Sequence, residues 1–133
     1  MLLVEDDEDH VFLIRRALAD TEDVAVTVEV ASDGEQATER LARSRYEPGG
    51  RPHLVLLDLK MPRMDGLEVL RRVRADEAAR GMPVVVLTSS EHQEDREEAL
   101  RLGASWFVCK PTDSRRLRSE IRQLAHHWAR VTA

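Results

Sequence analysis

The chain is organised around residues 54–66, which read LVLLDLKMPRMDG. Four apolar residues lead directly into Asp58, as in a buried strand of a parallel sheet, which is apolar on both faces. Ligands of open α/β sheets bind outside the carboxyl ends of the strands, where this carboxylate is expected. Pro62 and the pair Asp65 and Gly66 are typical of a turn that precedes a helix. Asp58 is therefore a candidate functional residue, and the alternative is an aspartate that only ends a strand in a turn.

The composition indicates an ordinary globular protein. Of its 133 residues, 42% are hydrophobic and 34% are charged, which suits a single domain, expected to span residues 1–133. The net charge of -5 argues against a nucleic-acid partner, and no apolar run reaches the ~20 residues that cross a membrane. The lone Cys109 excludes an internal disulfide and fits a reducing cytoplasm, where we expect the protein to act.

Short apolar runs alternate with segments of helical periodicity along the whole chain. Strands are predicted at residues 1–4, 24–31, 54–57, 83–87 and 106–109. Helices are predicted at residues 10–18, 34–43, 67–74 with an extension toward Gly81, 91–102 and from 113 or 114 to about 130. This alternation predicts an α/β fold, a doubly wound five-stranded parallel sheet with helices on both faces. The Pro- and Gly-rich residues 44–53 are either a tolerated surface loop or a partner or dimer contact through Tyr46.

Polar residues follow four of the predicted strands. The carboxyl ends of parallel strands lie at one edge of a sheet, so these residues are expected to converge although they are distant in sequence. They are three carboxylates, a hydroxyl and an ammonium, on Glu5, Asp6, Asp58, Thr88 and Lys110.

Five consecutive acidic residues, 5–9, follow the first predicted strand. Glu8 and Asp9 have a simple explanation, because acidic residues favour the positive end of a helix dipole. Five like charges in a row exceed that need, so we favour a bound cation near Glu5 and Asp6 over a solvated acidic face.

The predicted cluster suits phosphoryl chemistry. A carboxylate such as Asp58 can attack phosphorus and form an acyl phosphate, provided that the accumulating negative charge is offset. Mg²⁺ takes oxygen ligands, which Asp6 and Asp58 can supply, with Glu5 acting directly or through water. Lys110 can pair with one phosphoryl oxygen, and Thr88 can donate its hydroxyl to another.

At these residues the chain resembles the receiver domain of two-component response regulators. The matching motifs are Leu3-Val4-Glu5-Asp6-Asp7, Leu57-Asp58-Leu59-Lys60-Met61-Pro62-Arg63-Met64-Asp65-Gly66, Leu87-Thr88-Ser89 and Cys109-Lys110-Pro111. They cover nearly the whole chain in the family's order and spacing, so the match is highly specific.

The resemblance implies a flavodoxin-like (βα)5 fold in which Asp58 accepts a phosphoryl group from a phosphohistidine of a sensor histidine kinase. It also implies Mg²⁺ held by Asp6, Asp58 and the backbone carbonyl of Lys60, with Glu5 acting through water. A cis peptide bond before Pro111 is a further family expectation. The output is then switched binding to other proteins, not an enzyme activity of the chain's own.

The family also implies a conformational switch. In such proteins phosphorylation draws the hydroxyl of Thr88 toward the phosphoryl group, and an aromatic residue moves into the vacated space. The matching position is Phe107, which lacks the hydroxyl of a tyrosine. The alternative is that Phe107 is half-buried core.

A finer resemblance is to the stand-alone regulators that partner bacterial phytochromes and related hybrid kinases. It implies a light or redox sensor as the kinase and a homodimer through the last two helices or the last strand. We hypothesise that Leu117, Ile121, Trp128 and the neighbouring arginines form the dimer surface.

Three other functions compete with a terminal regulator. Haloacid-dehalogenase-like phosphatases also use a strand-end aspartate and Mg²⁺, but they need a second acid two residues later, where this chain has Lys60. A scaffold that has lost phosphorylation has no reason to hold three carboxylates together. A phosphorelay carrier that passes the group to a histidine phosphotransfer domain stays open.

The remaining reactive side chains have simple explanations. The five histidines do not group with Cys109 at a metal-ligand spacing, and Cys109 is expected to be buried. The basic last helix is interpreted as a solvated face. Lys60 and Ser90 lie two residues beyond Asp58 and Thr88, so we expect them to border the path of an attacking water.

Overall fold

The computed structural model describes residues 1–19, 26–44, 50–61, 64–77 and 79–132, and it contains five strands and five helices that alternate along the chain. The strands are β1 (Leu2–Val4), β2 (Glu29–Ala31), β3 (Val55–Leu57), β4 (Val84–Thr88) and β5 (Trp106–Cys109). The helices are α1 (Glu8–Ala19), α2 (Gly34–Arg43), α3 (Gly66–Ala75), α4 (Gln93–Arg101) and α5 (Ser114–Thr132).

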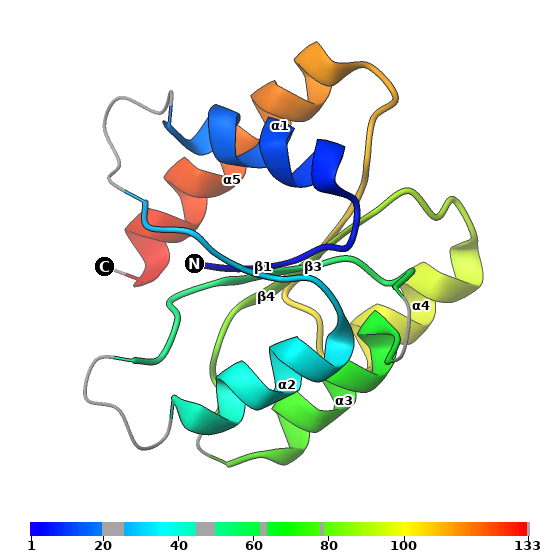
Figure 1. The fold of residues 1–133 in the computed structure, drawn as a ribbon. Helices are drawn as coiled ribbons and strands as arrows, with labels where there is room; N and C mark the ends of the chain where they lie inside the picture. The colour runs from blue at the N-terminus through cyan, green and yellow to red at the C-terminus, as the bar shows by residue number, and fades with distance from the viewer. Residues whose placement is uncertain (20–25, 45–49, 62–63, 78, 133) are drawn as a thin grey trace.

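All strand pairs are parallel, and the strand order is β2-β1-β3-β4-β5. Helices α1 and α5 cover one face of the sheet, and α2, α3 and α4 cover the other (Figure 1). The two faces are covered because the chain winds outward from β1 in one direction and then from β3 in the other. The predicted doubly wound, flavodoxin-like fold is confirmed.

Two rows of side chains across the sheet build the two cores. Strand register aligns Ala31, Val4, Leu57, Val86 and Phe107 in one row. That row is buried against α2, α3 and α4, and the alternate row of Leu3, Leu56 and Val85 packs against α1 and α5. The central strands are buried on both faces, which explains their unbroken apolar sequence.

Strand β2 is shorter than the predicted strand 24–31, of which residues 24–25 lie outside the described residues. It pairs only with β1, which offers three residues in the ladder. Met1 continues the pairing by one residue, since its N donates to Thr27 O at 2.9 Å and its O accepts from Glu29 N at 3.0 Å. Val26 and Val28 are only half buried. The boundaries of the other elements differ from prediction by one or two residues, apart from α2 and β5, which agree. Helix α3 ends at Ala75, so its predicted extension toward Gly81 is wrong.

Aspartates start several of the helices. The side chain of Asp33 accepts a hydrogen bond from Gln36 N at 2.8 Å, and Asp65 accepts one from Glu68 N at 3.0 Å. Asp7 caps α1 in the same way through Asp9 N at 2.9 Å, so Glu8 and Asp9 lie in the first turn and are not the caps.

Two further expectations concern the peptide bond before Pro111 and the loop residue Tyr46. The peptide bond before Pro111 is trans, so the expected cis bond is wrong; that expectation came from resemblance alone, and the trans form is intrinsically favoured by about 0.5–1 kcal/mol. Tyr46, the proposed loop contact, lies outside the described residues. Within the described chain, no helix is both long and apolar enough to cross a bilayer.

Gly66 closes the loop that follows β3. Its amide donates to Leu59 O at 3.1 Å, and a Cβ at this position would lie 2.3 Å from Asp58 O. Real Cβ atoms do not approach backbone oxygen this closely, so only glycine permits α3 to start against the end of β3.

We expect Gly66→Ala to lower the free energy of unfolding by about 2 kcal/mol or more, because the backbone of Asp58 must shift. Gly81→Ala is the matched control, since a Cβ there meets no atom within 4 Å. Urea unfolding followed by circular dichroism measures both. Equal and small effects in the two variants would contradict the close approach.

Candidate functional site

Backbone hydrogen bonds carry the polar residues to the rim of the sheet. Asp58 N donates to Val4 O at 3.0 Å, and Lys110 N donates to Thr88 O at 2.7 Å. Glu5 N donates to Ala31 O at 3.0 Å. The parallel ladder thus extends one residue past the strands, and the residues that follow them are held in register with one another.

Three carboxylates form an acidic pocket at this rim. One oxygen from each of Glu5, Asp6 and Asp58 lies within 4.8 Å of the others. Glu5 and Asp58 are buried, with 2% and 5% of their surface exposed, whereas Asp6 is open to solvent. The convergence predicted for these three residues is observed.

Burial raises the pKa of Glu5 to about 7. The hydrogen bond from Lys110 opposes this rise in pKa, and the nearby charge of Asp58 adds to it. The pocket therefore holds negative charge at a cost in stability, which a cation would relieve.

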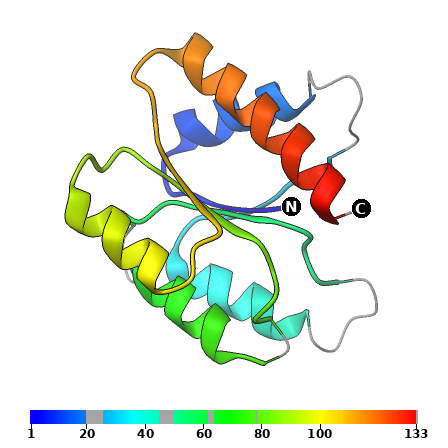
Figure 2. The same ribbon diagram turned by 180° about the vertical axis from the view of Figure 1, so that it is seen from behind.

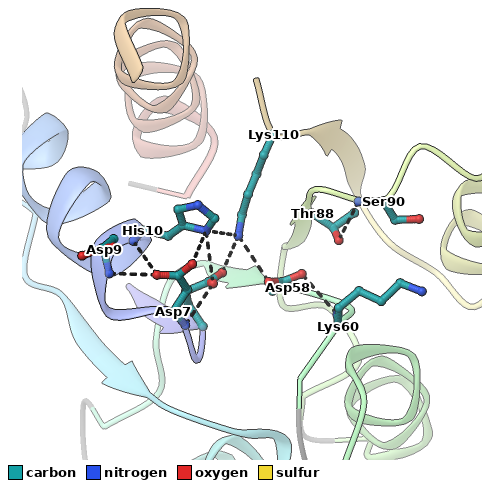
Figure 3. A network of polar contacts seen from close by, with 9 residues as sticks. Asp7, Asp9, His10, Asp58, Lys60, Thr88, Ser90 and Lys110 are labelled. Carbon is teal, nitrogen blue, oxygen red and sulfur yellow. Dashed lines mark hydrogen bonds and ion pairs between the residues drawn. The ribbon is translucent and has the colours of Figure 1, made fainter. Parts of the chain in front are cut away.

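Lys110 is the counter-charge of the buried carboxylates. Its Nζ lies 2.7 Å from Glu5 Oε2, 3.2 Å from Asp58 Oδ2 and 3.0 Å from His10 Nδ1 (Figure 3). An ammonium has three N–H donors, and this site offers three acceptors. Lys110 is only 8% exposed, so its position between the carboxylates is strongly determined.

His10 is a member of the site that sequence reasoning missed. It lies in the first turn of α1, with Nδ1 3.5 Å from Glu5 Oε1 and 3.6 Å from Asp7 Oδ2. In the sequence no histidine groups with Cys109 at a metal-ligand spacing, and among the described residues the acidic side chains Glu5, Asp6 and Asp58 are the group that could hold a metal ion. The available signal was its place in the helix turn that directly follows the acidic run.

Thr88 is fully buried at the end of β4, beside the pocket (Figure 3). Its Oγ1 accepts a hydrogen bond from Ser90 N at 3.3 Å, and no hydrogen bond joins it to Asp58 in this part of the structure. The hydroxyl proton of Thr88 is therefore not committed to the pocket.

Lys60 and Ser90 are linked through Asp95, a residue in the first turn of α4 that the sequence analysis did not single out. Ser90 Oγ donates to Asp95 Oδ2, and Lys60 Nζ lies 3.8 Å from the same oxygen. Lys60 N donates to Asp58 Oδ1 at 3.2 Å. The two residues expected to border the water path thus lie on either side of one acidic side chain.

Phe107 and Cys109 project from β5 on the α4 side of the sheet. Phe107 is 9% exposed at the end of its core row, and the guanidinium carbon of Arg96 lies 6.0 Å from its ring centroid. The location of Phe107 agrees with the alternative that it is a core residue, and its role in a switch stays a prediction. Cys109 is exposed, so its predicted burial is wrong; it stands on the edge strand, beyond the helix that would cover it.

The proposed dimer surface also needs correction. Leu117 and Ile121 are 3% and 0% exposed and pack in the core beneath α5, so they cannot contact a second copy. Of the three apolar residues named for that surface, only Trp128 is partly accessible.

The fold and the acidic rim define a phosphate-signalling class of α/β protein, and the comparison with known families agrees. The family model described as "Response regulator receiver domain" matches residues 1–122. The chain belongs to this family: it is a two-component receiver domain with an acidic pocket formed by Glu5, Asp6 and Asp58. The receiver domain is a signalling module rather than an enzyme, and receiver domains partner histidine kinases.

Particular relatives refine this class. The chain is 36% identical over 132 residues to the probable methanogenesis regulatory protein FilR2 of Methanothrix harundinacea, covering 96% of this chain and 82% of that one. Several other curated relatives are longer, and the chain spans 14% to 50% of their length.

Two solved structures have the same architecture and similar sequences. The phosphorylated cyanobacterial phytochrome response regulator RcpA superimposes with a TM-score of 0.91 at 31% identity, over 99% of this chain and 94% of that chain. The Mn(2+)-bound form of response regulator Rcp1 superimposes with a TM-score of 0.87 at 29% identity, over 96% and 91%. The chain is therefore similar to phytochrome-associated regulators.

We expect Glu5→Gln to stabilise the metal-free protein in a pH-dependent way. The pKa of Glu5 is about 7 in the folded protein against an ordinary 4.5, so the folded state keeps this proton longer. Stability contributed by the protonated form is lost as pH rises through this window. The variant should therefore gain about 1–2 kcal/mol relative to wild type between pH 4.5 and pH 8.

Urea unfolding in EDTA at several pH values measures this difference. Glu91→Gln, which changes an exposed glutamate, is the matched control for net charge. A difference between Glu5→Gln and wild type that stays constant across this pH range would contradict the raised pKa.

Proposed function

We propose that Asp58 accepts a phosphoryl group from the phosphohistidine of a sensor histidine kinase, and that the acyl phosphate switches binding to another protein. The observation that carries the proposal is the buried Asp58 carboxylate, held by Lys110 and flanked by two more acids. A carboxylate oxygen of Asp58 attacks phosphorus, the P–N bond of the phosphohistidine breaks, and the imidazole leaves with the bond's electron pair.

The donor set fits a hard divalent cation. Carboxylate and carbonyl oxygens are the ligands that Mg²⁺ prefers. Asp6, Asp58 and the carbonyl of Lys60 would hold the ion, and Glu5 would act through water. When bound, Mg²⁺ offsets the charge on the transferred group. The Mn(2+)-bound form of Rcp1 supports a divalent ion in a similar fold.

Lys110 would stabilise the transferred group as a compact cation. Glu5 and His10 hold its ammonium at the pocket, so the lysine can exchange its contact with Asp58 for a phosphoryl oxygen without losing its place. The chain contains only two lysines, Lys60 and Lys110, and both belong to this rim. A lysine suits a single phosphoryl oxygen, whereas arginine suits paired oxygens.

Thr88 and Phe107 would relay the change. The Thr88 hydroxyl can donate to a phosphoryl oxygen while Oγ1 still accepts from Ser90 N. Movement of Thr88 would therefore also move the loop that leads from Ser90 to α4. Phe107 lies on the same side of the sheet as α4, where it can follow that loop. This relay is the proposed means by which a local charge alters an interaction surface.

The proposed partners follow from the similar regulators. We propose a single receiver domain over residues 1–133 whose kinase is a phytochrome or another light or redox sensor, as the names of RcpA and its relatives suggest. A homodimer through the last two helices and β5 is kept as part of this proposal, without Leu117 and Ile121. A relay to a histidine phosphotransfer domain is the alternative output.

Incubation with acetyl phosphate and Mg²⁺ should add the mass of one phosphoryl group to the intact wild-type protein. Asp58→Asn should remain unmodified, because an amide does not attack phosphorus, and EDTA should prevent the reaction of wild type. Intact mass spectrometry measures all three. Phosphorylation of Asp58→Asn at the same rate would assign the reaction to another residue.

Lys60→Ala and Ser90→Ala should each change the lifetime of the phosphorylated form by about threefold or more, a barrier change near 0.7 kcal/mol. Both side chains lie beside Asp95 at the open side of the pocket, where water must enter. Arg71→Ala, which removes an exposed charge on α3, is the control. Decay of the acyl phosphate is followed by intact mass, and unchanged decay in both variants would remove the idea.

A further inference from the structure

A cavity lies between the edge strand β5, including Phe107, and α5. Its volume is about 600 Å³, within the range of small-molecule and side-chain binding sites. Its walls include Trp106 from β5 and Leu124, His127 and Trp128 from α5. Figure 2 shows this side of the molecule, with β5 in gold passing between α4 in yellow and α5 in orange to red.

Trp106 is exposed because the row of apolar side chains that contains it extends beyond the part of the sheet that α1 and α5 cover. Register places it after Leu3, Leu56 and Val85, which are all buried beneath α1 and α5. The side chain of Trp106 is nevertheless 57% exposed. An open indole face attracts cations through its quadrupole, so this wall suits a flat cationic group.

Glu120 gives the cavity its charge. It lines the wall from α5, and among the residues that the structure describes its buried Oε2 has no hydrogen-bond partner. Among the described lining residues, Glu120 is the only acid, and none is lysine or arginine. A single carboxylate on the wall of a cavity whose described lining has no lysine or arginine favours an occupant that donates hydrogen bonds and carries positive charge.

We propose that this cavity binds the guanidinium group of an arginine presented by a partner polypeptide, with Glu120 as counter-ion and Trp106 as the stacking wall. A guanidinium is planar and weakly hydrated, stacks on indole and donates to both oxygens of a carboxylate, whereas an ammonium is compact and strongly hydrated. A polypeptide is favoured as the source because the outer edge of β5 has no neighbouring strand in the sheet, and a segment beside it could also pair with the backbone.

The chain provides its own reporter for this site. It contains two tryptophans, Trp106 and Trp128, and both line the cavity. Tryptophan fluorescence titrated at constant ionic strength therefore measures binding of N-acetyl-arginine amide directly. N-acetyl-citrulline amide, which has nearly the same shape and no charge, is the matched ligand control.

Glu120→Gln should weaken binding of N-acetyl-arginine amide at least tenfold, which is about 1.4 kcal/mol. Trp106→Leu should weaken it as well, with Trp128 retained as the reporter. Glu94→Gln makes the same change in net charge on α4, outside the lining residues, and should bind like wild type. Circular dichroism checks that each variant is folded.

Each outcome decides the proposal. No saturable signal, equal binding of the citrulline derivative, or unchanged binding in Glu120→Gln would overturn the guanidinium site. A peptide with arginine between two alanines should bind more tightly than N-acetyl-arginine amide; equal affinity would overturn the polypeptide source in favour of a small molecule. Dissociation of a homodimer by the arginine derivative in light scattering would identify the partner as a second copy.

Discussion

The ion pair of Lys110 with Glu5 and Asp58 is the interaction on which the site depends. It joins the ends of β1, β3 and β5, which are far apart in the chain, through one buried ammonium. Two carboxylates this close and this buried would repel each other without a shared cation. Removing the lysine would leave uncompensated charge in the interior, which is far more costly than losing an exposed ion pair.

The same arrangement prepares the pocket for chemistry. The sheet fixes the backbone of each rim residue through the ladder, so side chains need little reorganisation before they act. Gly66 lets α3 begin against Asp58, and the Asp95 carboxylate ties Ser90 to the start of α4. Rigid strands thus hold Asp58, while the loops around it hold the groups that, under the proposed function, would respond to its phosphorylation.

The two faces of β5 have different surroundings. Phe107 lies in the core shared with α4. Trp106 lines the cavity between β5 and α5, and Glu120 is the acidic residue among its described lining residues. Successive side chains of a strand point to opposite faces, so a single edge strand can contact the switch on one face and a partner on the other.

The sequence by itself determined the fold class and the acidic pocket, because apolar runs that end in polar residues specify parallel strands and their shared rim. It also located Asp58, Thr88 and Lys110 at that rim, since each follows its strand within a residue or completes it. Only the tertiary structure decided which side chains surround them. His10 reaches Lys110 through the rotation of α1, Asp95 reaches Ser90 through the start of α4, and Cys109 is exposed because β5 is an edge. These contacts depend on how helices are turned and where the sheet stops, which local periodicity does not encode.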